Sequence, residues 1–356
     1  MSTHPNVLDG SAGDDVIYGG ADSGDTISEI ENVIGSATAV NTLTGSADDN
    51  VLSGGSANDV FWTAVGDGTD TFDGAGGTDE LHYLGSGVSV NLSTEVDTLT
   101  SIEAIYMTAG ADTLIADGVA RSHYLGAGND AFTGGAGVDT VYGEAGDDTV
   151  YVSAGADVLD GGTGTNTLNF TNLNTAVTLN LASQTAVQSA STTNYSSFSQ
   201  FVLSDSTDVI NSDGVDIITI DAGNNTDTVN YSGAAVTLSI VGTTATLGNN
   251  TINNAEVFTL DSGDDTINAD GSAATIDAAG GTGDVANYTG VGAATLTLSG
   301  GAGSFGADTI SNVETYVLTG NNDTINADGS SVTVDGAAGA GDTIIYTGAG
   351  AINVTL

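Results

Sequence analysis

Cysteine is absent from this chain of 356 residues, lysine and arginine together occur once, and proline occurs once. Without cysteine, neither disulfides nor thiolate metal sites can form. The one basic side chain, Arg121, stands against 46 acidic residues and a formal net charge of −45. Nucleic acid and anionic membranes are therefore excluded as partners, because both bind cationic surfaces. The rarity of proline allows long strand ladders without interruption.

Signals for membrane insertion and for common catalytic sites are also missing. No segment reaches the roughly 18 apolar residues of a transmembrane helix, and the first ten residues lack the basic start and apolar run of a cleavable signal. The sequence contains no HExxH and no G-x-S-x-G, and it has no lysine for a Schiff base. We expect His82 and His123 at the edges of the fold, outside any catalytic site. The sequence therefore predicts a protein that is not an enzyme.

Five consecutive nine-residue units are the most informative feature that is present. Between Leu125 and Asn169 they read LGAGNDAFT, GGAGVDTVY, GEAGDDTVY, VSAGADVLD and GGTGTNTLN. Position four is always glycine, position six is aspartate and finally Asn166, and position eight is always apolar. A turn with glycine, one carboxylate and one inward apolar residue predict a short strand alternating with a sharp turn.

Related patterns extend through the rest of the chain. Similar nonads occupy 10–18, 45–62 and 65–82, and a longer repeat relates 98–118, 251–271 and 309–329. Glu31, Glu103, Glu256 and Glu314 hold the same place in the longer repeat, where we expect strand or turn residues and not metal ligands. Strictly alternating segments such as VTLNL (177–181) predict strands with one buried face.

These periods predict an all-β fold, a parallel β-solenoid of the β-roll type with stacked coils of about 18–20 residues. We expect two regions, residues 1–170 with the well-formed nonads and residues 171–356 with degenerate coils that continue the same rod. The segment 183–200, rich in serine and threonine, is expected to be a loop or a decorated coil.

Position six supplies carboxylates that can meet across coils. With two nonads per coil, turns on one edge recur every 18 residues, which pairs Asp130 with Asp148 and Asp139 with Asp157. Carboxylate and backbone carbonyl oxygens are the ligands that Ca²⁺ prefers. The alternative is that these aspartates only form Asx turns. For the isolated acidic turns at Asp265 and Asp323 we favour Asx turns over calcium binding.

The run GGAGVDTVYGEAGDD resembles the haemolysin-type calcium-binding nonapeptide G-G-x-G-x-D-x-U-x, the RTX repeat. The resemblance is strong over 125–169, moderate over 10–28 and 45–82, and weak after 170. It implies a parallel β-roll, Ca²⁺ as cofactor, folding that depends on calcium, and export through a one-step channel of the type I kind. The residues it assigns to calcium are Asp130, Asp139, Asp148, Asp157, Gly128, Gly137, Gly146, Gly155, Asp15, Asp59, Asp70 and Asp79.

The repeats run from about residue 7 to the last residue, and neither end carries an evident polar cap. We therefore expect a secreted, extracellular or cell-surface structural protein whose copies join head to tail into a filament, matrix fibre or surface layer. The alternative is a calcium-dependent adhesin that binds cell-surface glycans, which a cluster of exposed aromatic side chains would favour.

Overall fold

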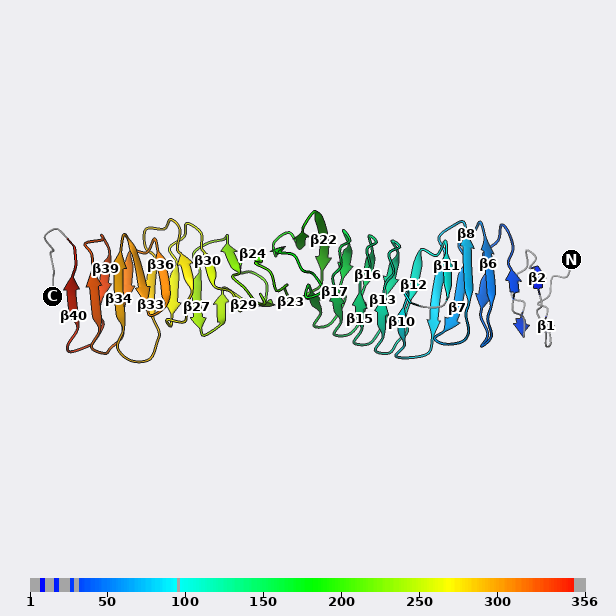
Figure 1. Cartoon of the computed structure of the whole chain (residues 1–356), viewed down its shortest axis with the longest axis horizontal. Coiled ribbons are helices and arrows are strands. Elements are labelled where there is room, and N and C mark those ends of the chain that lie inside the picture. The colour runs from blue at the N-terminus through cyan, green and yellow to red at the C-terminus, as the bar shows by residue number, and fades with distance from the viewer. Residues whose placement is uncertain (1–6, 10–15, 19–25, 29–31, 95–96, 349–356) are drawn as a thin grey trace. The chain divides into compact units, whose positions relative to one another are not determined.

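Every regular element in the described part of the computed structural model is a β-strand (Figure 1). The structure describes residues 7–9, 16–18, 26–28, 32–94 and 97–348. Most strands pair in parallel with strands one coil away, as in a parallel β-solenoid, so the predicted fold class is confirmed. The chain divides into two compact units. Unit 1 comprises Met1–Asn169 with Ser191–Phe198, and unit 2 comprises Phe170–Ala190 with Ser199–Leu356.

The strands of unit 1 are mostly three residues long. They are β1 (Val7–Asp9), β2 (Val16–Tyr18), β3 (Thr26–Ser28), β4 (Asn32–Ile34), β5 (Thr42–Thr44), β6 (Val51–Gly55), β7 (Val60–Ala64), β8 (Thr71–Ala75), β9 (Glu80–Leu84), β10 (Ser89–Asn91), β11 (Thr98–Thr100), β12 (Ala104–Tyr106), β13 (Thr113–Ile115), β14 (Ser122–Tyr124), β15 (Ala131–Thr133), β16 (Thr140–Tyr142), β17 (Thr149–Tyr151), β18 (Val158–Asp160), β19 (Thr167–Asn169) and β22 (Ser191–Ser196).

The strands of unit 2 are mostly three to five residues long. They are β20 (Val177–Asn180), β21 (Thr185–Gln188), β23 (Gln200–Val202), β24 (Val209–Ser212), β25 (Thr219–Asp221), β26 (Thr228–Tyr231), β27 (Thr237–Val241), β28 (Thr244–Leu247), β29 (Asn250–Asn253), β30 (Val257–Thr259), β31 (Thr266–Ala269), β32 (Thr275–Asp277), β33 (Val285–Tyr288), β34 (Thr295–Ser299), β35 (Ala302–Phe305), β36 (Asp308–Ser311), β37 (Thr315–Val317), β38 (Thr324–Ala327), β39 (Thr333–Asp335) and β40 (Thr343–Tyr346).

The five nonads supply β15 to β19, which extend two rows of parallel strands, one on each face of the coil. In one row β13, β15, β17 and β19 pair in register, and in the other β14, β16 and β18 do so. The middle residue of each triplet points inward and is buried, as Phe132, Val141 and Val150 show. This is position eight of the nonad, and its apolar character lets successive coils bury a continuous core.

Unit 2 departs from the predicted coil length. Three antiparallel elements interrupt its parallel rows, namely β20–β21, β27–β28–β29 and β34–β35–β36. Equivalent residues of successive coils lie 19 apart where no hairpin intervenes, as for Asp208 and Asp227. They lie 29 apart where a hairpin is inserted, as for Val236 and Asp265. The longer coils keep the register because each hairpin leaves and rejoins the stack between paired strands.

The prediction of a loop over residues 183–200 is wrong. Strand β21 forms an antiparallel hairpin with β20, and β22 pairs in parallel with β18. Tyr195 and Phe198 are buried, at 6% and 8% exposure. These two aromatic side chains, separated by two residues, hold the segment against the core, although serine and threonine dominate its composition.

Candidate calcium sites

The aspartates at position six form a hydrogen-bonded ladder along one edge of the nonad coils. The backbone N–H of Asp112 donates to Oδ1 of Asp130 (2.7 Å), and the N–H of Asp130 donates to Oδ1 of Asp148 (2.8 Å). The N–H of Asp148 continues the ladder to Oδ1 of Asn166 (2.9 Å). Each carboxylate therefore supplies an acceptor to the turn of the preceding coil, and the predicted pair Asp130–Asp148 is brought together.

The opposite edge carries a second ladder. There the N–H of Arg121 donates to Oδ1 of Asp139 (3.2 Å), and the N–H of Asp139 donates to Oδ1 of Asp157 (2.9 Å). The pair Asp139–Asp157 also meets, as the 18-residue period predicts. All four aspartates of the two predicted pairs are at most 2% exposed. The Asx turn alone, in which the side chain bonds its own turn, does not describe these contacts, because they join different coils.

The second carboxylate oxygens are the unusual feature of the ladders. Oδ2 of Asp130, Asp139 and Asp148 is buried and has no hydrogen-bond partner among the described residues. Burial raises the pKa of Asp130 to about 6 and that of Asp157 to about 6, and it also raises the pKa of Asp148. A buried, unpartnered carboxylate oxygen is costly unless a cation compensates it. These atoms therefore favour a bound cation.

The glycines at position four are required by the close stacking of the turns. Gly128 and Gly146 have φ of +149° and +141°, a region that L side chains rarely adopt. A Cβ at Gly146 would overlap the carbonyl oxygen of Gly128, and a Cβ at Gly155 would overlap that of Gly137. The glycine carbonyls consequently lie close to the turn of the next coil, where each ladder places its carboxylates.

The donor set suits calcium. Within the described ranges no group of three or more His, Cys, Asp or Glu side chains is placed to hold a metal ion. A site here would therefore combine a carboxylate pair with turn carbonyls of the same edge, such as that of Gly128 beside Asp130 and Asp148 or that of Gly137 beside Asp139 and Asp157. Ca²⁺ takes 6–8 oxygen ligands in a flexible shell, whereas structural zinc sites are tetrahedral and built from Cys and His. The residues present fit calcium, and the assignment of individual ligands stays a prediction.

The upstream aspartates differ among themselves. Asp59 has both oxygens engaged, since Oδ1 accepts the N–H of Asn41 (2.6 Å) and Oδ2 accepts that of Gly55 (2.7 Å). Oδ1 of Asp70 accepts the N–H of Asn50 (2.8 Å), and burial raises the pKa of Asp70 to about 6. Asp79 matches the nonad run, because its Oδ1 accepts the N–H of Asp59 and its Oδ2 has no partner among the described residues. Asp15 lies outside the described residues.

Three further ladder aspartates lie outside the set predicted to bind calcium. In each of them the second carboxylate oxygen accepts hydrogen bonds from a serine or threonine four positions earlier. The N–H groups of Thr108, Ser204 and Thr319 donate to Oδ2 of Asp112 (2.6 Å), Asp208 (3.0 Å) and Asp323 (3.0 Å). Their hydroxyls lie within 3.1 Å of the same carboxylates. We call this contact the hydroxyl lock. Ser or Thr at position two is a sequence signal for this contact but is not sufficient, because Ser153 also stands four residues before Asp157, a residue that the resemblance assigns to calcium.

The glutamates of the longer repeat also belong to the ladders. Oε2 of Glu103, Glu256 and Glu314 accepts the N–H of Asp79 (2.8 Å), Asp227 (2.9 Å) and Asp284 (2.9 Å). They are thus neither ordinary strand residues nor assigned ligands, because each takes the place of an aspartate as the acceptor in a ladder. Glu31 lies outside the described residues.

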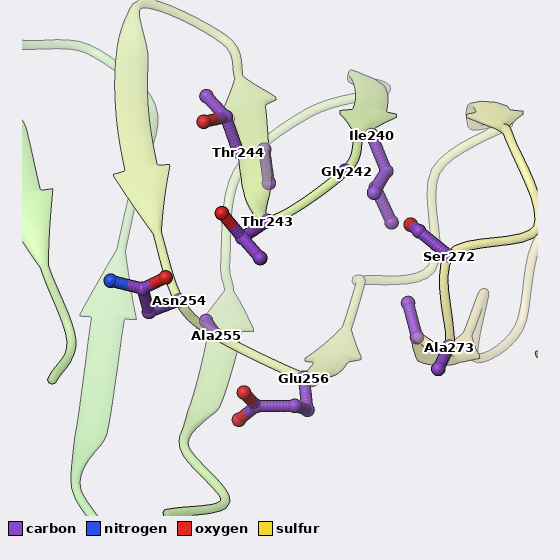
Figure 2. A pocket seen from close by; sticks show the side chains of 11 residues that line it. Ile240, Gly242, Thr243, Thr244, Asn254, Ala255, Glu256, Ser272 and Ala273 are labelled. Atoms are coloured by element: carbon purple, nitrogen blue, oxygen red, sulfur yellow. The ribbon is translucent and has the colours of Figure 1, made fainter. Parts of the chain in front are cut away.

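A pocket in unit 2 contains one of these glutamates (Figure 2). Ile240, Thr243, Asn254 and Ser272 line it together with Glu256, which is the only titratable side chain of its wall. Because the Glu256 carboxylate already accepts the Asp227 N–H, the pocket offers no acid–base pair for catalysis.

His123 is not at an edge, contrary to the sequence-based expectation. It is the middle residue of β14, between Ile105 and Val141 in the buried row, and is fully buried. Its Nε2 lies 3.5 Å from Oδ1 of Asp139, and its ring packs 5.0 Å from that of Phe132. The histidine therefore fills a core position of the stack.

Comparison with known proteins agrees with this geometry. The family model described as RTX calcium-binding nonapeptide repeat matches residues 3–23, 38–69, 124–159 and 133–168. The resemblance seen in the sequence is confirmed, and these repeats bind Ca²⁺. No curated protein matches the chain.

Proposed function

Because this chain carries the RTX calcium-binding nonapeptide repeat, we propose that it is a secreted structural protein of the extracellular space or cell surface. In this role calcium ions clamp successive coils, and copies join head to tail into a filament or layer. The observation that supports the proposal is the stacking of buried carboxylates with unpartnered second oxygens, because a cation bound there would compensate their charge and join successive coils. Proteins with these repeats are typically secreted, and the described residues include no helix able to span a membrane.

The head-to-tail contact is proposed at β40, where an apolar side chain in a core register position is exposed. Ile344 of β40 pairs in register with Ile325 of β38. Ile325 is 5% exposed, whereas Ile344 is 44% exposed. Covering Ile344 with a further strand would remove apolar surface from water, and a second copy of the chain can supply that strand.

Electron microscopy and analytical ultracentrifugation test the assembly. Wild-type protein in millimolar calcium should form fibres or sheets, and Ile344→Asp should weaken their formation. Val291→Asp is the control, because Val291 lies fully exposed in a turn away from β40. Monodisperse monomers of the wild type in calcium, or equal loss with both substitutions, would contradict the assembly.

The adhesin alternative rests on a row of aromatic side chains on β7, β9, β12, β14 and β16. The rings stack with centroids 4.2–4.8 Å apart in the order Trp62, His82, Tyr106, Tyr124 and Tyr142. Sugars pack on exposed ring faces, but the inner rings of this row cover the faces of one another. The row therefore stabilises the stack of coils and supports the structural role. Titration with oligosaccharides, followed by Trp62 fluorescence, distinguishes the two functions.

A further inference from the structure

Unit 2 repeats the calcium geometry in a place that the family model does not match. The turn 261–265 lies over the turn 279–284 of the next coil, and the N–H of Asp265 donates to Oδ1 of Asp284 (2.6 Å). A Cβ at Gly281 would overlap the carbonyl oxygen of Gly263, as at the glycines of the nonad run. These contacts reproduce the carboxylate ladder and the stacked glycine carbonyls.

Position five is reproduced as well. In the nonad run, the N–H of Asp147 donates to Oδ1 of Asn129 (3.0 Å). In unit 2, the N–H of Thr282 donates to Oδ1 of Asp264 (3.1 Å). The two turns therefore superimpose their contacts at positions four, five and six, although the turn 279–284 is one residue longer than a nonad turn.

The second carboxylate oxygens of these aspartates are an independent observation that points to a bound cation. Oδ2 of Asp265 and Oδ2 of Asp284 are buried without a hydrogen-bond partner among the described residues, and the two residues are 1% and 0% exposed. The ladder aspartates Asp208 and Asp323 of the same unit have the hydroxyl lock, so their second oxygens are already satisfied. The position four residues before Asp265 is Asp261, which cannot donate a hydroxyl hydrogen when ionised.

We propose that unit 2 binds a calcium ion between the turns 261–265 and 279–284, with the carboxylates of Asp265 and Asp284 as ligands. The carbonyls of Gly263 and the neighbouring turn residues complete an oxygen shell of the kind that calcium takes. This site deepens the calcium-dependent function proposed above and does not depend on self-assembly. It reverses the expectation that Asp265 only forms an Asx turn.

The first test compares calcium stoichiometry of the full chain by titration calorimetry. Asp265→Asn with Asp284→Asn keeps the Oδ1 acceptors, as Asn166 does in the nonad ladder. It should lower the stoichiometry by about one ion per chain. The control, Asp216→Asn with Asp335→Asn, removes the same charge at exposed positions of the same unit and should leave the stoichiometry unchanged.

A second variant closes the site without removing either ligand. Asp261→Thr places a hydroxyl four residues before Asp265, where it can donate to Oδ2 as Thr319 does to Asp323. It should lose the same ion. An unchanged stoichiometry in both variants, or an equal loss in the control, would overturn the site.

Hydrogen exchange separates this proposal from the calcium binding of unit 1. In the wild type, calcium should slow exchange of the amides of both 128–157 and 261–284. Protection at 128–157 alone overturns only the site in unit 2, whereas no protection in either segment overturns the calcium-dependent function as a whole.

Discussion

Replacing Asp130 with asparagine separates the hydrogen-bonding role of the ladder from its charge. The new side-chain amide would still accept the N–H of Asp112 through its oxygen, just as Asn166 accepts the N–H of Asp148. The buried charge would be lost. The substitution should therefore have opposite effects on stability without and with calcium.

The size of the effect without calcium follows from the pKa of Asp130. Burial raises that pKa from 3.8 to about 6. Ionising Asp130 above pH 6 then destabilises the calcium-free fold by up to about 3 kcal/mol, at roughly 1.4 kcal/mol per pKa unit. At pH 7.5 with chelator, Asp130→Asn should raise the free energy of unfolding by up to this amount.

With calcium the order should reverse. One ion at about 1,000 times its Kd stabilises the fold by about 4.1 kcal/mol, which exceeds the penalty of the buried charge, and the variant loses a charged ligand for that ion. The assay is urea denaturation followed by circular dichroism, with calcium and with chelator. Asp112→Asn is the control: an amide nitrogen facing the N–H of Thr108 should lower stability by about 1–3 kcal/mol in both conditions. If Asp130→Asn lowers stability equally in both conditions, the carboxylate is only a structural acceptor and the reasoning fails.

Three further predictions concern pH, glycine and the aromatic row. The raised pKa values of Asp70, Asp130 and Asp157 stabilise the calcium-free fold fully below pH 3.8, and this contribution is lost as pH rises through about 6. The rise in melting temperature on adding calcium should thus grow between pH 4 and pH 7.5, and a constant increment would contradict it. Gly146→Ala should lower the free energy of unfolding, measured by thermal denaturation, by about 1–3 kcal/mol or more, because Gly146 has a positive φ and its Cβ would overlap the Gly128 carbonyl. Gly118→Ala is the control and should be nearly neutral, because a Cβ there meets open space. Tyr124→Ala removes two of the ring stacks and should cost about 1–3 kcal/mol with no change in calcium stoichiometry, measured by calorimetry.

The nine-residue period of the sequence was enough to predict much of the architecture. The apolar residue at position eight, such as Phe132 or Val150, had to face inward because a strand alternates its side chains every two residues. The 18-residue spacing of Asp130 and Asp148 followed from two nonads per coil, and the structure places them in contact. These features are readable because each depends on residues within one or two coils.

The tertiary structure decided what each carboxylate faces. Whether the second oxygen of an aspartate is free for a cation depends on contacts within its turn, so Asp323 is closed by Thr319 while Asp265 is open. The inward position of His123 and the strand at Ser191–Ser196 also depended on which coil packs beside them. Sequence period sets which side chains recur at the same edge, and packing between coils determines which of their polar atoms remain unsatisfied and can hold calcium.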